Sequence, residues 1–329
     1  WRISNRWANG AFEEITKELP KAQVTPLTTA ILGKFAVVSD MHLDDGLESQ
    51  RDEVSQQDIE DLVAGIKEEG VDFVIVNGDI VNDKSYTTGK GCYSDTYIEK
   101  LWGRFNDEFR NKLKEQNINV LTVPGNHDLG VSDSCDKTQF YMNHPLDDTH
   151  IQIIDGSNYP LYYSFLYRDA LFLIFDNSLS NYRYDTINHD WLREQIESGK
   201  INVNHVLIFM HIPPKDPSYW NGVNAVMKPD HWNQIADAIG DTNVAIYTGH
   251  DHVYFKGNYE DIPFIYSGST SHPRDLENNK GVNQPKSFIV TEIHEEDINV
   301  YAKTGDRYTE VFPENFDGIS GFTEFRYEN

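Results

Sequence analysis

The sequence predicts an α/β domain, because short apolar runs typical of buried strands alternate with segments whose apolar residues have helical spacing. Several of these strands lead directly into short polar motifs, at the edge where sheets of this class usually hold their sites. No repeat, low-complexity tract or linker interrupts the pattern. We therefore expect one main domain over residues 31–329, preceded by a polar N-terminal extension over residues 1–30.

The first half of the main domain predicts three strands and two helices. The strands cover residues 35–38, 73–76 and 120–123. Residues 54–69 predict a helix, because Ile59, Leu62 and Ile66 recur at helical spacing. A longer helix is expected over residues 95–116, where apolar side chains recur in the same way.

The second half of the domain continues with strands and two shorter helices. The strands are expected at residues 151–154, 162–167, 171–175, 206–210, 244–247, 264–266, 288–293 and 298–302. The helices are expected at about residues 190–197 and at residues 229–239. The strands at 206–210 and 244–247 each lead into a polar motif, as the three strands of the first half do.

The composition is that of a globular protein and argues against two kinds of partner. Hydrophobic residues make up 39% of the chain and aromatic residues 12%. The net charge of −25 repels polyanions at long range, which disfavours nucleic acid as a partner. No apolar run approaches the roughly 20 residues that a membrane-spanning helix needs, so we expect no membrane span.

The chain contains two cysteines, Cys92 and Cys135, which excludes a cysteine-rich zinc scaffold. Both lie in segments that leave the same edge of the predicted sheet, so a disulfide between them is geometrically feasible. Such a bond implies an oxidising compartment and favours an extracytoplasmic, periplasmic or secreted location over a cytoplasmic one. The alternative is two unrelated thiols in a cytoplasmic protein.

Five polar motifs together contain enough metal-binding side chains for two ions. The motifs are Asp40-Met41-His42, Gly78-Asp79, Gly125-Asn126-His127-Asp128, His211 and Gly249-His250-Asp251-His252. Mixed carboxylate, amide and imidazole ligands suit manganese, iron or zinc better than calcium. The motifs therefore predict a centre of two divalent or trivalent ions.

The spacing within two of these motifs predicts how their side chains are presented. Residues two apart in an extended chain point to the same side, so Asp40 and His42 are expected to reach one ion. The same spacing presents His250 and His252 together, while Asp251 points away from them.

Asp79 is the expected shared ligand of the two ions. Two divalent cations about 3.5–4 Å apart repel each other strongly, and a shared carboxylate offsets this repulsion. Asp79 follows a buried strand, and Gly78 allows the backbone to approach closely. Asn126 offers a neutral amide oxygen, which limits the charge at the second ion.

The five motifs, in this order, resemble the signature of the calcineurin-like metallophosphoesterase superfamily, and the resemblance extends from Asp40 to His252. It implies two mixed β-sheets packed as a sandwich and flanked by helices, in four αββα layers. It also implies that residues 31–329 form a catalytic domain that hydrolyses phosphoric esters. A metal-bridging hydroxide would attack the phosphorus atom in line.

The resemblance also implies a role for each motif residue. One ion would be held by Asp40, His42, Asp79 and His252, and the other by Asp79, Asn126, His211 and His250. His127 would lie near the leaving oxygen, as general acid or phosphate ligand, oriented by Asp128. An imidazole can titrate in the working pH range, which makes proton donation by His127 feasible.

The motifs disfavour two branches of the superfamily. Protein Ser/Thr phosphatases carry Gly-Asp-x-Val-Asp-Arg-Gly and Gly-Asn-His-Glu, whereas this chain has Asn82 and Asp83 after Val81, and Asp128 in the third motif. Purple acid phosphatases have Asp-x-Gly as their first motif, with glycine at the position of His42. They also have a tyrosine ligand at the position of Asn82. We therefore expect a small phosphomonoester or phosphodiester as substrate. A nuclease and a non-catalytic binding scaffold on the same fold are the alternatives.

Two loops outside the motifs contain candidate substrate contacts. Tyr219 and Trp220 follow the fourth motif in a loop that could form a wall of the substrate pocket, or could simply anchor that loop by packing. His272 and Arg274 leave a strand after the last motif and could contact a phosphate group; an ordinary loop is the alternative.

Overall fold

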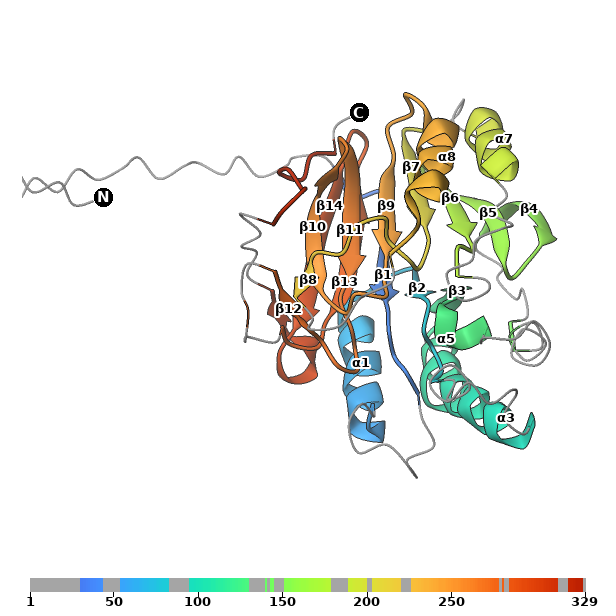
Figure 1. Ribbon diagram of the computed structural model, residues 1–329. Coiled ribbons are helices and arrows are strands. Elements are labelled where there is room, and N and C mark those ends of the chain that lie inside the picture. Colours follow the sequence, from blue (N-terminus) through green and yellow to red (C-terminus); the bar gives the residue numbers. More distant parts are fainter. Residues whose placement is uncertain are drawn as a thin grey trace, which may run out of the picture.

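The computed structural model describes residues 30–43, 54–82, 95–129, 140, 143–144, 151–178, 189–199, 203–219, 226–277, 280, 284–312 and 319–327. Nearly all of the predicted N-terminal extension, together with Cys92, Cys135 and Trp220, lies outside these residues. In the described part of the chain, two large mixed β-sheets lie face to face with helices on their outer sides (Figure 1).

The first sheet has the strand order β15-β14-β13-β1-β2-β3. Its strands are β1 (Gly33–Val38), β2 (Phe73–Asn77), β3 (Asn119–Val123), β13 (Phe288–Ile293), β14 (Ile298–Thr304) and β15 (Glu310–Val311). Strands β1, β2 and β3 are parallel to one another, whereas β13 is antiparallel to β1. The carboxyl ends of β1, β2 and β3 therefore meet at one edge of the sheet.

The second sheet has the strand order β10-β11-β9-β7-β6-β5-β4. Its strands are β4 (Gln152–Asn158), β5 (Tyr162–Tyr167), β6 (Ala170–Phe175), β7 (His205–Phe209), β9 (Ala245–Thr248), β10 (Tyr254–Tyr259) and β11 (Ile262–Ser267). Strands β6, β7, β9 and β11 are parallel, so β7 and β9 also end at a common edge. A separate two-stranded sheet pairs β8 (Ser218–Tyr219) with β12 (Asp275–Leu276).

The main core lies between the two sheets, and the strands alternate between facing it and facing the helices. On β1, Phe35 and Val37 belong to the core between the sheets. Ala36 and Val38 belong instead to the cluster on the outer face of the first sheet. The period of two follows from the alternation of side chains along a strand. Phe35 meets Phe172 of the second sheet edge to face, with ring centroids 5.2 Å apart.

Helices cover the outer face of each sheet. They are α1 (Gln56–Glu69), α3 (Asp95–Arg104), a π-helical segment (Phe105–Arg110), α4 (Asn111–Lys114), α5 (Asn126–Leu129), α7 (His189–Gly199), α8 (Pro229–Ile239) and a 3₁₀ turn (Asp306–Tyr308). Buried side chains of α1 and of the π-helical segment pack on the first sheet, and those of α7 and α8 pack on the second. None of the described helices has the length and apolar character needed to cross a membrane.

Several elements differ from those expected from the sequence, and they include the short elements α5, β8, β12 and β15, which were not expected. The helix predicted over residues 95–116 is present, but its middle is a π-helical segment and its last regular turn ends at Lys114. Strand β10 was not expected at all. It contains Lys256, Gly257 and Asn258, which lack the apolar pattern of a buried strand, and its antiparallel pairing with β11 stabilises it.

Candidate metal centre

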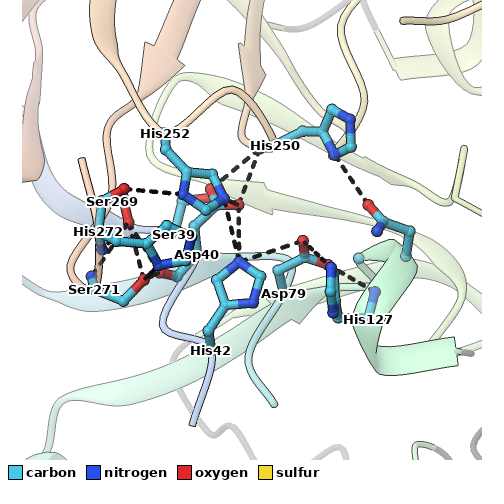
Figure 2. Close-up of polar contacts among 12 residues, drawn as sticks. Ser39, Asp40, His42, Asp79, His127, His250, His252, Ser269, Ser271 and His272 are labelled. Atoms are coloured by element: carbon cyan, nitrogen blue, oxygen red, sulfur yellow. Dashed lines mark hydrogen bonds and ion pairs between the residues drawn. The ribbon is translucent and has the colours of Figure 1, made fainter. Parts of the chain in front are cut away.

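The predicted metal ligands follow five strands at one edge of the sandwich. The loops after β1 and β2 contribute Asp40, His42 and Asp79, and the first residue of α5, which follows β3, contributes Asn126. The loops after β7 and β9 contribute His211, His250 and His252. Figure 2 shows side chains from these loops converging on a small region. Both sheets therefore have to be assembled before the ligands can meet.

Five of these ligands adopt a left-handed backbone conformation. Their φ values are 53° at Asp40, 46° at His42, 50° at Asp79, 70° at His250 and 59° at His252. Residues other than glycine are held in this region only where the surrounding structure enforces it, and such positions cluster at functional sites. The expectation that the Asp40–His42 and His250–His252 pairs are extended is therefore wrong. Sharp turns, rather than strand geometry, aim these side chains.

The first group of ligands contains Asp40, His42 and His252. Nε2 of His42 lies 3.2 Å from Nε2 of His252, which in turn lies 3.2 Å from Oδ1 of Asp40. All three residues are buried. Two imidazole nitrogens that face each other beside a buried carboxylate need a proton or a cation between them. A metal ion therefore fits this group.

The second group contains Asp79, Asn126, His211 and His250. Nε2 of His211 lies 3.2 Å from Oδ2 of Asp79, and Nδ1 of His250 lies 3.0 Å from Oδ1 of Asn126. Ligand atoms of Asp79, His211 and His250 all lie within 4.8 Å of one another. This group also has the donor types and the spacing that an ion requires.

Asp79 lies at the junction of the two groups. Its Oδ2 atom is 3.6 Å from Nε2 of His42 in the first group and 3.2 Å from Nε2 of His211 in the second. Its Oδ1 atom accepts a hydrogen bond of 2.8 Å from the backbone N–H of His127. One carboxylate oxygen is thus directed at both groups while the other is held by the chain, as a shared ligand requires.

Backbone carbonyls determine which ring nitrogen of two histidines is available to a metal. Nδ1 of His211 lies 2.8 Å from the carbonyl oxygen of Asn77, and Nδ1 of His252 lies 3.1 Å from that of His272. A carbonyl only accepts, so each Nδ1 is the donor, and in the neutral ring the lone pair is on Nε2. In both residues Nε2 is the atom that faces Asp40 or Asp79.

The electrostatics of the site favour a cation. Burial by itself would raise the pKa of Asp40, but the imidazoles of His252 and His42 outweigh it and hold the pKa well below its usual value. Asp79 behaves in the same way, chiefly because of His211. Burial would lower the pKa of His211, yet the Asp79 carboxylate raises it to about 10. The buried carboxylates thus attract positive charge, and a metal ion competes with a proton for the His211 ring.

His127 and Asp128 belong to α5 but make different contacts. The ring of His127 lies edge to face against His42, and its Nε2 is 4.0 Å from Oδ2 of Asp79. With a side chain 15% exposed, His127 is more open to solvent than the buried ligands around it. Asp128 accepts hydrogen bonds from the backbone N–H groups of Ile80, Val81 and Gly125. These bonds join the start of α5 to the loop after β2.

Three of the candidate substrate contacts lie in the described part of the chain, and each has different neighbours. Tyr219 lies in β8 and pairs with Asp275, and Nζ of Lys280 lies 4.2 Å from its ring centroid. The backbone N–H of Arg274 donates to the carbonyl of His252 at 2.9 Å, which attaches this loop to the metal site. His272 lies closest to the centre, with its ring 4.1 Å from that of His252.

Serine residues outside the five motifs hold Asp40 in place, and the sequence did not identify them as part of the site. The hydroxyl of Ser39 donates to Oδ2 of Asp40 at 2.6 Å. The hydroxyls of Ser269 and Ser271 donate to the Asp40 carbonyl at 3.1 and 2.7 Å. The serine-rich loop was visible in the sequence, but no local signal connects it to a residue more than 200 positions earlier.

The sequence of this chain also matches a family model and curated proteins. Residues 33–254 match the model of the family described as calcineurin-like phosphoesterase. Proteins named Serine/threonine-protein phosphatase CPPED1 from Rattus norvegicus and Mus musculus are 25% and 24% identical over 174 residues. Each alignment covers 48% of this chain and 49% of the relative, so the chain spans about half the length of the curated relatives it matches.

Solved structures show the same fold. A dimetal phosphatase from Danio rerio, LOC 393393, aligns with a TM-score of 0.52 at 14% identity, covering 86% of this chain and 98% of that one. Purple acid phosphatase PPD1 from yellow lupin aligns with a TM-score of 0.59 at 14% identity, covering 86% of this chain and 53% of that one. The predicted four-layer fold is thereby confirmed. With the family match over residues 33–254, it follows that this chain belongs to the calcineurin-like phosphoesterase family of metal-dependent phosphoesterases.

Proposed function

We propose that this chain hydrolyses small phosphoric esters, either monoesters or diesters, with two metal ions chosen from manganese, iron and zinc. The observation that carries the proposal is the position of Oδ2 of Asp79, 3.6 Å from Nε2 of His42 and 3.2 Å from Nε2 of His211. One oxygen shared by two ligand groups is the arrangement that a two-metal phosphoesterase uses to hold its ions about 3.5–4 Å apart.

The metal ions, when bound, supply a nucleophile from water at neutral pH and neutralise charge on the phosphoryl oxygens. The residues of the chain hold the ions in position and supply the proton for the departing group. Asp79 holds the two halves of the centre together, and the N–H of His127 fixes its second oxygen. The partly exposed His127 ring, at the rim of the centre, donates a proton to the departing oxygen of the ester.

Small esters are the preferred substrate class in this proposal. The rodent relatives are named as serine/threonine-protein phosphatases, but they are matched over only about half of their length. The second motif here continues as Asn82-Asp83 and lacks the arginine that the protein phosphatases carry. The net charge of −25 opposes a nuclease, and the filled ligand positions oppose a scaffold without catalysis.

The proposal is tested with metal-stripped protein reloaded with manganese, zinc, iron or magnesium. The substrates are p-nitrophenyl phosphate, bis-p-nitrophenyl phosphate, cyclic nucleotides, phospholipid headgroup esters and a phosphoserine peptide. We expect the stripped protein to be inactive and one or more of manganese, iron and zinc to restore hydrolysis of a small ester. Protein that binds two ions but hydrolyses none of the small esters would contradict the proposal.

A further inference from the structure

His272 lies against the first ligand group, although no family motif includes it. Its ring centroid is 4.1 Å from that of His252 and 4.9 Å from that of His42 (Figure 2). One ring nitrogen from each of the three histidines lies within 4.8 Å of the other two. Ligands that share an ion at bond lengths of about 2.1 Å lie up to about 4.2 Å apart. The spacing of the three rings is therefore close to that of a common metal site.

The hydrogen bonds of Ser271 determine which nitrogen of His272 is available. Ser271 has one hydroxyl hydrogen, and its Oγ lies 2.7 Å from the carbonyl oxygen of Asp40, which can only accept. Ser271 therefore donates to Asp40 and accepts from Nδ1 of His272, 2.8 Å away. With the hydrogen on Nδ1, the neutral ring has its lone pair on Nε2, which is the form that binds a metal ion.

The backbone of His272 is also held by the residues around the centre. Its N–H donates to the hydroxyl of Ser269 at 3.2 Å, and its carbonyl accepts from Nδ1 of His252 at 3.1 Å. The same residue thus orients one ligand of the first group through its carbonyl and places a second imidazole beside it. Ser269 and Ser271 also bind the Asp40 carbonyl, so the position of His272 relative to Asp40 is well defined.

His205 is a buried histidine outside the candidate metal centre, and its ring nitrogens offer a comparison. Nδ1 of His205 lies 3.1 Å from the hydroxyl of Tyr327, and its Nε2 lies 2.7 Å from the carbonyl oxygen of His294. Both ring nitrogens of His205 are therefore used by protein groups. At His272 the hydrogen bond to Ser271 uses Nδ1 and leaves Nε2 for an ion.

We propose that Nε2 of His272 is a further ligand of the first metal ion, beside His42 and His252. The inference rests on the proposed function only in requiring that this centre binds metal. It replaces the phosphate contact expected from the sequence. A third imidazole makes the first ion bind more tightly than it would with the family ligands alone, and it makes the two ion sites unequal.

The test measures metal binding rather than turnover. Metal-stripped wild type, His272→Ala and His272→Gln are titrated with cobalt or zinc by calorimetry, and the absorption spectrum of the cobalt forms is recorded. We expect the wild type to bind two ions, and each variant to bind one of the two at least roughly 10–100-fold more weakly, because losing a group that only supports a ligand already costs that much. The cobalt spectrum of that site should change. His231→Ala, which removes a histidine from α8, is the matched control and should bind as the wild type does.

Thermal unfolding shows whether each variant is folded. Alanine and glutamine differ in size, so the test can still be made if one of the two variants does not fold. Unchanged affinity for both ions, with an unchanged cobalt spectrum in either folded variant, would overturn the proposal. If the KM for p-nitrophenyl phosphate then rises, His272 is a substrate contact instead. A wild type that binds two ions, shows the His272 effect and hydrolyses no ester supports this inference while contradicting the proposed function.

Discussion

Gly125 lies directly against Asp79, so that a Cβ atom placed on Gly125 would overlap the backbone nitrogen and Oδ1 of Asp79. The close approach brings the loop after β3 onto the loop after β2. It also lets the N–H of His127 reach Oδ1 of Asp79 at 2.8 Å. The glycine of the third motif is therefore required for space at the junction of the two ligand groups.

Gly125→Ala is expected to displace Asp79 and to lower both metal content and activity, because the added methyl group meets backbone that cannot move aside cheaply. Elemental analysis and thermal unfolding measure these effects. The control is Gly103→Ala in α3, where a Cβ meets nothing within 4 Å. That substitution should raise the free energy of unfolding by roughly 0.5–1 kcal/mol. Two tightly bound ions in Gly125→Ala would contradict the prediction.

Asp79→Asn should remove metal occupancy and activity together, because one carboxylate oxygen is directed at both ligand groups. The amide retains the shape but lacks the charge that attracts the cations. Asp72→Asn is a matched control, since Asp72 directly precedes β2, the strand that Asp79 follows, and accepts a hydrogen bond from the hydroxyl of Tyr167. The idea fails if Asp79→Asn still holds two ions and turns over within roughly tenfold of wild type.

His127→Ala should retain the metal ions but lose about 10²–10⁴-fold in rate, the range that a general acid contributes. The loss should be smaller for nitrophenyl esters, because a good leaving group does not need a proton. Rates for matched nitrophenyl and alkyl phosphates, with metal content measured on the same samples, decide the matter. Equal losses for both esters would indicate phosphate binding rather than proton donation.

His144 should make the protein less stable as the pH falls below about 6.5, the pKa of histidine in an unfolded chain. Burial, followed by the charge of Arg110, lowers the pKa of folded His144 well below that value. Below pH 6.5 the unfolded chain therefore binds a proton that the folded protein does not. Each such group costs up to about 1.4 kcal/mol per pH unit.

Urea unfolding of wild type and His144→Gln at pH 7.5, 6.5 and 5.5 checks this dependence. Glutamine does not titrate, so the stability of the variant should fall less steeply between pH 6.5 and 5.5. The ring of His144 stacks on Phe140 with centroids 4.0 Å apart, so the variant should be less stable at every pH. Parallel curves for the two proteins would show that His144 is not responsible.

Cys92 and Cys135 test the proposed extracytoplasmic location. If they are bonded, the disulfide closes a ring of 44 residues, counted from Cys92 through Cys135 inclusive. Such a ring stabilises by on the order of 4 kcal/mol in the chain-entropy model, and reduction should lower the melting temperature accordingly. Mass spectrometry of the alkylated, non-reduced protein gives the answer. Free alkylation of both cysteines would remove the main support for this location.

Local patterns in the sequence determined most of the elements and the order of the candidate ligands. Strand β5 was predicted at residues 162–167 and helix α8 at residues 229–239, and both have these bounds in the structure. Periodicity of apolar residues is a property of neighbouring positions, so it is readable without the fold. The metal-ligand motifs were readable for the same reason, because each follows its own strand.

The tertiary structure alone decided how those ligands are aimed and what supports them. The left-handed turns at Asp40 and His42 are imposed by contacts with other loops, so the sequence suggested an extended segment there instead. The hydrogen bond from Ser271 to Asp40 joins positions 231 residues apart. Contacts of this kind depend on the packing of both sheets, and no pattern among neighbouring residues contains that information. The position of His272 beside His42 and His252 likewise depends on the folded chain.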